Sequence, residues 1–152
     1  RDYAGEPQRC EFVRNIGGVD FVNDSKGTNV GATVAALEGM GRPVVLIAGG
    51  LGKGQDFTPL AEAVRRHARA LVLIGRDAPL IRGALGDAPM PLREASSMDE
   101  AVRTAMEEAV EGDVVLLSPA CASMDMFRNY VERGRRFVEA VNELALDRGE
   151  VA

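Results

Sequence analysis

The sequence predicts an α/β domain built on a mainly parallel sheet of about six strands, with one antiparallel edge and helices on both faces. Short apolar, β-rich runs alternate with helical segments of about ten or more residues, which is the pattern of strands joined by helical crossovers. The first two β-rich runs are separated only by Gly17-Gly18, a hairpin signal that makes the opening pair antiparallel. A length of 152 residues suits one domain, so residues 1–152 are treated as a single unit.

The first half of the chain is expected to form the hairpin and then two units of helix followed by strand. The hairpin strands are expected at 10–16 and 19–23, the helices at 29–40 and 58–67, and the following strands at 44–48 and 70–74. Thr58 and Pro59 stand where an N-cap and a first-turn proline belong, so they are expected to begin the second helix.

The second half continues the alternation. A short helix is expected at 77–85, a weak strand at 90–94, a helix from 97 to about 110, a strand at 114–117 and a last helix at about 127–146. Ser97-Met-Asp-Glu100 is a capping box that marks the start of the middle helix. No linker, repeat or low-complexity stretch interrupts the series, which supports one domain.

Composition and charge exclude several broad classes of partner. With 46% hydrophobic residues, 27% charged residues and a net charge of -5, the chain is typical of a soluble protein that binds neither nucleic acid nor an anionic membrane. No apolar run approaches the roughly 18 residues of a membrane helix, and the first residues lack a signal-peptide core, so a cytoplasmic location is expected. Cys10 and Cys121 lack metal-binding spacing and are expected to be free thiols. A start at Arg1 without Met suggests a piece of a longer protein.

Polar loops follow three of the predicted strands. Their functional groups are Asp24, Ser25, Lys26 and Thr28 in the first loop, Lys53 in the second and Ser123 in the third. Because the carboxyl ends of parallel strands lie along one edge of a sheet, the three loops are expected to converge on one ligand. Two lysines, several hydroxyls and the N-terminus of the helix at 29–40 suit a small dicarboxylate or phosphate, since they combine positive charge with directed donors.

The glycine-rich loop at 49–54 does not match either of two common phosphate-binding motifs. It is not a Walker A loop, because Ile47 takes the place of the first glycine and Gly54 follows Lys53 where Ser or Thr is required. It is not a dinucleotide-binding fingerprint, because Gln55 stands where the last glycine is required. Lys53 then remains on a flexible turn, and a solvated surface lysine is the alternative explanation.

Several side chains have an ordinary structural explanation beside a functional one. Arg9 is compatible with a surface residue, and Asp24 with a turn or cap acceptor. His67 lies at a helix end, where it complements the helix dipole, and Tyr130 is compatible with packing of the last helix. No second histidine or nucleophile elbow is present, so no catalytic triad is expected.

Four motifs resemble the carboxy-terminal domain of the Mur ligase family: RCE at 9–11, NDSKGTN at 23–29, GGLGKGQDF at 49–57 and LSPACASMDMFRNYVERG at 117–134. The resemblance covers about residues 6–144 and is strongest to members that add D-glutamate. It implies a Rossmann-like fold within an ATP-dependent amide ligase that joins D-glutamate to UDP-N-acetylmuramoyl-L-alanine in peptidoglycan synthesis. It also implies that a UDP-binding domain and a central ATPase domain, which binds ATP and Mg²⁺, lie outside residues 1–152, so this chain alone is expected to be inactive.

The resemblance also implies roles for residues at matching positions. D-Glutamate would be surrounded by Thr28, Lys53, Ser123, Met124 and Tyr130, with Lys26 close by, and the nucleotide would be reached by Arg9 and Asp24. No catalytic residue or metal ligand is implied within the chain. Gln8, Gly27 and Tyr130 depart from the His, Ala and Phe that are common in the family, and the first departure concerns the interdomain site.

Two other functions remain open on the sequence. One is another amide ligase of the same superfamily, acting on a different amino acid or on folylpolyglutamate. The other is a non-catalytic, anion-binding α/β module. A P-loop domain upstream of this chain would separate a ligase from such a module.

Overall fold

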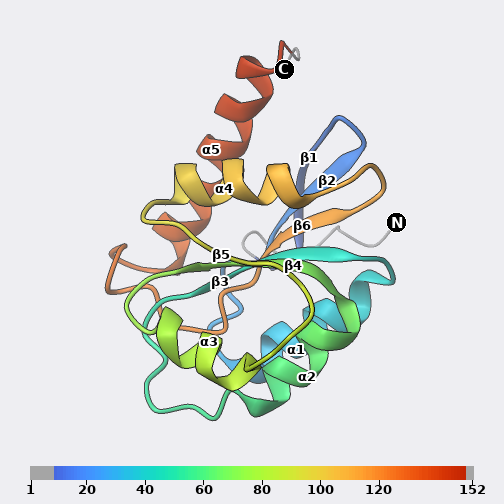
Figure 1. Cartoon of the computed structure of the whole chain (residues 1–152). Coiled ribbons are helices and arrows are strands. Elements are labelled where there is room, and N and C mark those ends of the chain that lie inside the picture. The colour runs from blue at the N-terminus through green and yellow to red at the C-terminus, as the bar shows by residue number, and fades with distance from the viewer. Residues whose placement is uncertain (1–8, 150–152) are drawn as a thin grey trace.

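Six strands form one sheet in the order β1-β2-β6-β3-β4-β5 in the computed structural model, which describes residues 9–149 (Figure 1). The strands are β1 (Glu11–Ile16), β2 (Val19–Asn23), β3 (Val44–Gly49), β4 (Ala68–Ile74), β5 (Leu92–Glu94) and β6 (Val114–Leu117). β1 pairs antiparallel with β2, and all the other strand pairs among the described residues are parallel. The predicted mainly parallel sheet with an antiparallel edge is confirmed.

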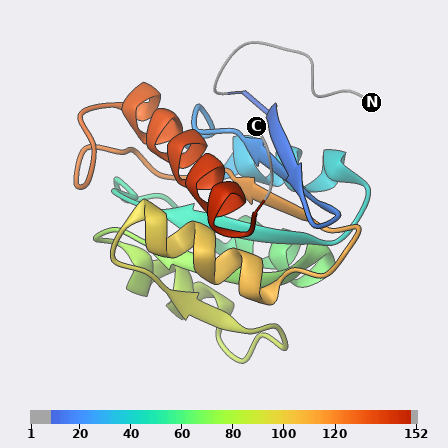
Figure 2. The ribbon, with the colours of Figure 1, turned by 90° about the horizontal axis from the view of Figure 1, so that it is seen from above.

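Helices cover both faces of the sheet (Figures 1 and 2). They are α1 (Val30–Met40), α2 (Thr58–His67), α3 (Ala78–Leu85), α4 (Met98–Glu108) and α5 (Tyr130–Asp147). The central strand β3 shows how the two cores are divided: Leu46 packs in the core with α1, α2 and α3, whereas Val45 and Ile47 pack in the core with α4 and α5. Because both faces are covered, every residue of β3 is buried. None of these helices has the length and apolar character needed to cross a membrane.

The turn between β1 and β2 explains the Gly17-Gly18 pair. Both glycines have left-handed backbone, with φ of 58° and 86°, which is the combination that a type I′ hairpin turn requires. Because β1 runs antiparallel to β2, its first residue, Glu11, lies opposite Asn23 at the end of β2. The segment that enters the domain therefore lies at the carboxyl edge of the parallel strands.

Side chains cap three of the helices. Asn29 begins α1, Ser97 begins α4 and Asn129 begins α5, and each accepts a hydrogen bond from a backbone N–H in the first turn, at 2.9, 3.1 and 2.9 Å. The cap at Asn129 explains why α5 begins later than predicted. The predicted cap of α2 is wrong: Phe57 is the N-cap, and Thr58 is already helical.

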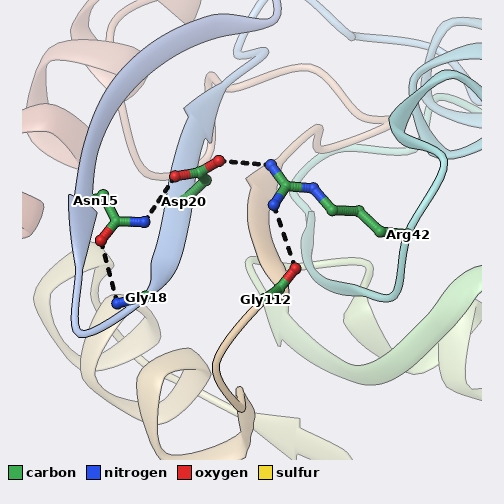
Figure 3. A network of polar contacts seen from close by, with 5 residues as sticks. All are labelled: Asn15, Gly18, Asp20, Arg42 and Gly112. Atoms are coloured by element: carbon green, nitrogen blue, oxygen red, sulfur yellow. Dashed lines mark hydrogen bonds and ion pairs between the residues drawn. The ribbon is translucent and has the colours of Figure 1, made fainter. Parts of the chain in front are cut away.

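A network of polar contacts joins the amino ends of the central strands (Figure 3). Asp20 accepts hydrogen bonds from Arg42 at 2.5 Å and from Asn15 at 2.8 Å. Arg42 also donates to the Gly112 carbonyl at 3.2 Å, and the Asn15 side chain accepts from the Gly18 N–H at 3.1 Å. These contacts tie the hairpin turn to the segments before β3 and β6, at the edge of the sheet opposite the three polar loops.

Candidate functional site

The loops that follow β2, β3 and β6 are bonded to one another at the carboxyl edge of the sheet. The Ala120 N–H donates to the Gly27 carbonyl at 2.8 Å, and Leu51 and Ala122 exchange two backbone hydrogen bonds at 2.9 Å. The prediction that these three loops meet is confirmed, and their binding of one common ligand stays a prediction. Segments far apart in the sequence therefore share one hydrogen-bonded frame.

Asp24, directly after β2, is buried and is held at both carboxylate oxygens. Its Oδ1 accepts from the Cys10 N–H at 3.1 Å, and its Oδ2 accepts from the Ser118 hydroxyl at 2.7 Å. Burial raises the pKa of Asp24 above its ordinary value of 3.8, although the hydrogen bonds from Ser118 and Cys10 and the charge of Arg9 act in the opposite direction. Desolvation of the carboxylate therefore outweighs the stabilisation that these partners supply.

We expect Asp24→Asn to gain stability relative to the wild type as the pH rises above 3.8, the ordinary pKa of this carboxyl. A carboxyl whose pKa is raised in the folded state contributes its full stability only below the unfolded pKa, and this contribution is lost as the pH rises through the folded pKa. The asparagine amide keeps an acceptor for the Cys10 N–H and carries no charge. Urea denaturation of both proteins from about pH 3 to about pH 7 measures the difference, which would be independent of pH if the folded pKa were ordinary.

An open pocket of about 400 Å³ lies beside Asp24. Its lining consists of three charged residues, Arg9, Asp24 and Lys26, and of small residues, Cys10, Gly27, Ala32, Ala35 and Ala36. The structure thus brings Lys26 together with Arg9 and Asp24, the two residues that the resemblance assigns to the nucleotide. Two cations beside one carboxylate suit a ligand that has both negative charge and hydroxyl donors. Gln8 lies outside the described residues.

Both cysteines are free, as predicted, and both thiols are poor nucleophiles. Burial and the neighbouring Asp24 raise the pKa of Cys10 to about 11. Burial raises the pKa of Cys121 to about 12. Since the thiolate is the reactive form, neither residue suits covalent catalysis near neutral pH.

Side chains of the protein itself occupy the N-terminus of α1. The Val30 N–H donates to Oε1 of Gln55 at 2.8 Å, and the Ala32 N–H donates to Oδ1 of Asn29 at 2.9 Å. The expectation that this helix end presents its N–H groups to an anion is therefore wrong for these two donors. Sequence reasoning missed the role of Gln55, which entered only as the residue that breaks a glycine motif.

Arg133 on α5 is a second residue that sequence reasoning missed. It is only 1% exposed, and its guanidinium donates to the Ser25 hydroxyl at 3.0 Å, to the Ser25 carbonyl at 2.7 Å and to the Cys121 carbonyl at 2.9 Å. Burial lowers the pKa of Arg133 to about 10, which leaves it cationic near neutral pH. Arg133 thus fastens the loop after β2 to the loop after β6. Its position four residues before the buried Phe137 was the available signal, because residues at this spacing share a helix face.

Thr28 and Lys53 come from the first two of the joined loops. Thr28 is half-buried and stands directly before the cap of α1. Lys53 is exposed on the turn after β3, where it adopts a left-handed φ of 54°. The turn holds the lysine backbone in a conformation that is uncommon outside glycine, while the ammonium group faces solvent.

Ser123, Met124 and Tyr130 come from the segment after β6. Ser123 is buried, and its carbonyl accepts hydrogen bonds from two backbone N–H groups in the same loop, at 3.1 and 2.9 Å. Met124 is 68% exposed. Tyr130 is half-buried at the start of α5, and its carbonyl accepts from the Ser25 hydroxyl at 2.6 Å. The start of α5 is therefore bonded to the loop that carries Thr28.

Comparison of the sequence with known families and proteins gives one consistent result. Residues 8–121 match the family described as "Mur ligase, glutamate ligase domain". The chain is 69% identical over 151 residues to the UDP-N-acetylmuramoylalanine–D-glutamate ligase of Bordetella avium, covering 99% of the chain and 30% of that relative. It is 62% identical over 149 residues to the ligase of the same name from Ralstonia nicotianae, covering 98% of the chain and 30% of that relative. The chain thus spans about a third or less of the length of these relatives.

Solved structures share the fold at low sequence identity. The MurF ligase of Thermotoga maritima in complex with ADP has a TM-score of 0.64 and 15% identity, over 95% of this chain and 32% of that one. The folylpolyglutamate synthase of Mycobacterium tuberculosis complexed with ADP and AMPPCP has a TM-score of 0.61 and 15% identity, over 92% of this chain and 32% of that one. At this identity, the likeness shows the fold alone.

Proposed function

Because the chain belongs to the Mur ligase family, in its glutamate ligase domain, we propose that it is the amino-acid-binding domain of a ligase that adds D-glutamate to UDP-N-acetylmuramoyl-L-alanine. The observation that carries the proposal is the 69% identity, over 99% of the chain, to a D-glutamate ligase. The proposal includes a UDP-binding domain and an ATPase domain outside residues 1–152. Free thiols at Cys10 and Cys121 fit a cytoplasmic enzyme of peptidoglycan synthesis.

The proposed reaction joins a carboxylate to an amine at the expense of ATP. When bound, ATP supplies the phosphoryl group that activates the acceptor carboxylate, and the central domain would hold most of the nucleotide and its Mg²⁺. The neutral D-glutamate amine would attack the activated carbonyl carbon and form the C–N bond, phosphate would leave with the bonding pair of the C–O bond, and the amine nitrogen would release a proton. The contribution of this domain is to hold the amine donor in reach of that carbon, because positioning alone lowers such a barrier substantially.

The joined loops supply the groups that a dicarboxylate needs. Lys53 would neutralise one carboxylate, and Thr28 and Ser123 would donate hydrogen bonds that fix its direction. Met124 and Tyr130 would line the site, and Lys26 would add positive potential nearby. The bonds between the three loops support this assignment, since they hold these residues in one frame.

The pocket beside Asp24 suits the part of the nucleotide that reaches this domain. Arg9 and Lys26 offer positive charge to phosphate oxygens, and Asp24 offers a buried acceptor to a ribose hydroxyl. The small residues of α1 leave the pocket open. These residues would complete the nucleotide site only when the domains close, as in lid-type enzymes.

Substrate-dependent release of phosphate by the full-length protein tests the proposed function. With ATP, Mg²⁺ and UDP-N-acetylmuramoyl-L-alanine present, phosphate release should require D-glutamate. L-Glutamate, L-alanine and a folate with L-glutamate serve as comparisons, since the solved structures that share this fold include an alanine ligase and folylpolyglutamate synthases. Turnover with one of them in place of D-glutamate would assign the protein to another ligase of the family, and ligand binding without turnover would favour the non-catalytic module.

We expect Arg9→Ala and Asp24→Ala each to raise the KM for ATP of the full-length ligase by roughly 10- to 100-fold, because each removes a charge-assisted contact worth about 1.5–3 kcal/mol. The KM for D-glutamate should change much less. Steady-state titrations of ATP and of D-glutamate measure the two KM values separately. Arg66→Ala, which removes an exposed cation on α2, is the matched control. A selective defect in D-glutamate would place Arg9 and Asp24 in the amino-acid site instead.

A further inference from the structure

We propose that Gln55 is a positioning residue for D-glutamate, because its side-chain amide fastens the turn that carries Lys53 to the loops that carry Thr28 and Ser123. The inference rests on the proposed function. It concerns how the charge of Lys53 is held in place, and it assigns this role to a residue that would not itself touch the ligand.

The Gln55 amide makes three hydrogen bonds to three separate segments. Its Oε1 accepts from the Val30 N–H at 2.8 Å, which joins it to the start of α1. Its Nε2 donates to the Ala120 carbonyl at 2.8 Å, in the loop after β6, and to the Gly52 carbonyl at 2.9 Å, within its own turn. One half-buried side chain thus connects its own turn to the loop after β6 and to the start of α1, which directly follows the loop that carries Thr28.

The chemistry of these contacts specifies glutamine. A primary amide has two N–H donors and a carbonyl acceptor, and the contacts use both donors and the acceptor, so they fix one orientation of the group. A carboxylate at this position would place negative charge against the carbonyls of Gly52 and Ala120. An apolar side chain of the same length would leave those carbonyls and the Val30 N–H without these partners.

The position of Lys53 depends on this amide. Lys53 lies between Gly52 and Gln55, and the turn is closed by a backbone bond from the Gln55 N–H to the Gly52 carbonyl at 3.2 Å. Lys53 and Gly54 are both left-handed, with φ of 54° and 75°. Because Gln55 also occupies the Val30 N–H at the end of α1, Lys53 becomes the main positive group that this side of the site offers to a carboxylate.

The test compares two substitutions in the full-length ligase. Gln55→Met keeps the length of the side chain and removes its hydrogen bonds, and Gln55→Glu keeps one acceptor and replaces the donors with charge. Both should raise the KM for D-glutamate by roughly 5- to 10-fold, as expected for the loss of neutral hydrogen bonds. The KM for ATP should stay within about 2-fold of the wild type, because the pocket of Arg9 and Asp24 does not include Gln55. Glu62→Gln, on the exposed face of α2, is the control.

A double-mutant cycle with Lys53→Ala separates positioning from general destabilisation. If Gln55 acts through Lys53, Gln55→Met should change the KM for D-glutamate by less than about 2-fold once Lys53 is absent. Full additivity, or an unchanged KM in the single variants, would overturn the inference. If Gln55→Met does not fold, Gln55→Glu decides by the same criteria. A wild type without D-glutamate-dependent turnover would instead contradict the proposed function.

Discussion

If the proposed function holds, replacing Lys53 with alanine is expected to raise the KM for D-glutamate of the proposed full-length ligase by roughly 10- to 100-fold, because a charge-assisted contact to a carboxylate is worth about 1.5–3 kcal/mol. Lys53 is exposed, and the size of the effect distinguishes a lysine that binds a D-glutamate carboxylate from a lysine that is only a solvated surface charge. A solvated surface ion pair contributes about 0–1 kcal/mol, which corresponds to a change of about 5-fold at most. A larger change requires that the ligand contact be desolvated when the ligase closes.

Titration of D-glutamate at saturating ATP measures the effect of Lys53→Ala. Arg66→Ala is again the control, since it removes an exposed cation from α2 without altering the joined loops. Lys53→Arg tests whether positive charge alone is sufficient. Arginine keeps the charge but presents its donors in a rigid planar group, so we expect only part of the affinity for D-glutamate to be retained. Identical D-glutamate kinetics in the wild type and Lys53→Ala would leave Lys53 as a surface charge.

Replacing Arg133 with methionine is expected to lower the free energy of unfolding by roughly 3 kcal/mol, because it leaves two buried carbonyls and a buried hydroxyl without this donor. The affected acceptors are the Ser25 carbonyl and hydroxyl and the Cys121 carbonyl. Methionine retains much of the apolar stem, so the loss reflects the polar contacts more than a cavity. The loops after β2 and β6 should also loosen relative to each other.

Chemical denaturation of the chain carrying Arg133→Met measures this loss. Arg136→Met is the matched control on the same helix, since its half-exposed guanidinium lies 4.0 Å from Asp99 and 3.8 Å from Glu139. Such exposed pairs contribute about 0–1 kcal/mol. Equal unfolding free energies for Arg133→Met and the wild type would mean that the cost of burying the guanidinium cancels its hydrogen bonds, as some buried charges do.

Local patterns were sufficient to predict the sheet and its helices. The Gly17-Gly18 turn, the capping box at Ser97 and the apolar run of β6 each act over a few residues, and each predicted element is present. The start of α5 was missed because the cap at Asn129 competes with an apolar pattern that continues upstream. The N-cap of α2 was missed because Asp56, and not Thr58, accepts the hydrogen bond of the first turn.

The candidate site was less accessible to sequence reasoning, because its decisive contacts join distant residues. Gln55 bonds to Val30 and to Ala120, which lie 25 and 65 residues away along the chain. Arg133 bonds to Ser25 from 108 residues away. Nothing local marks a glutamine in a glycine-rich turn, or an arginine near a helix start, as a bridge between loops. The loops themselves were predictable, since their strands end at one edge.

The antiparallel direction of β1 has a mechanical consequence. A parallel first strand would have delivered Arg9 to the opposite edge of the sheet, roughly 20 Å away for six residues at about 3.3 Å each. Instead, Glu11 lies opposite Asn23, so the chain enters beside Asp24. In the proposed ligase, where an ATPase domain would precede β1, rotation of this domain about the entry would move the Lys53 turn through a longer arc than Arg9. A small closing movement would then complete the nucleotide contacts of Arg9 and Asp24, while the Lys53 turn would travel further towards the reacting carbon.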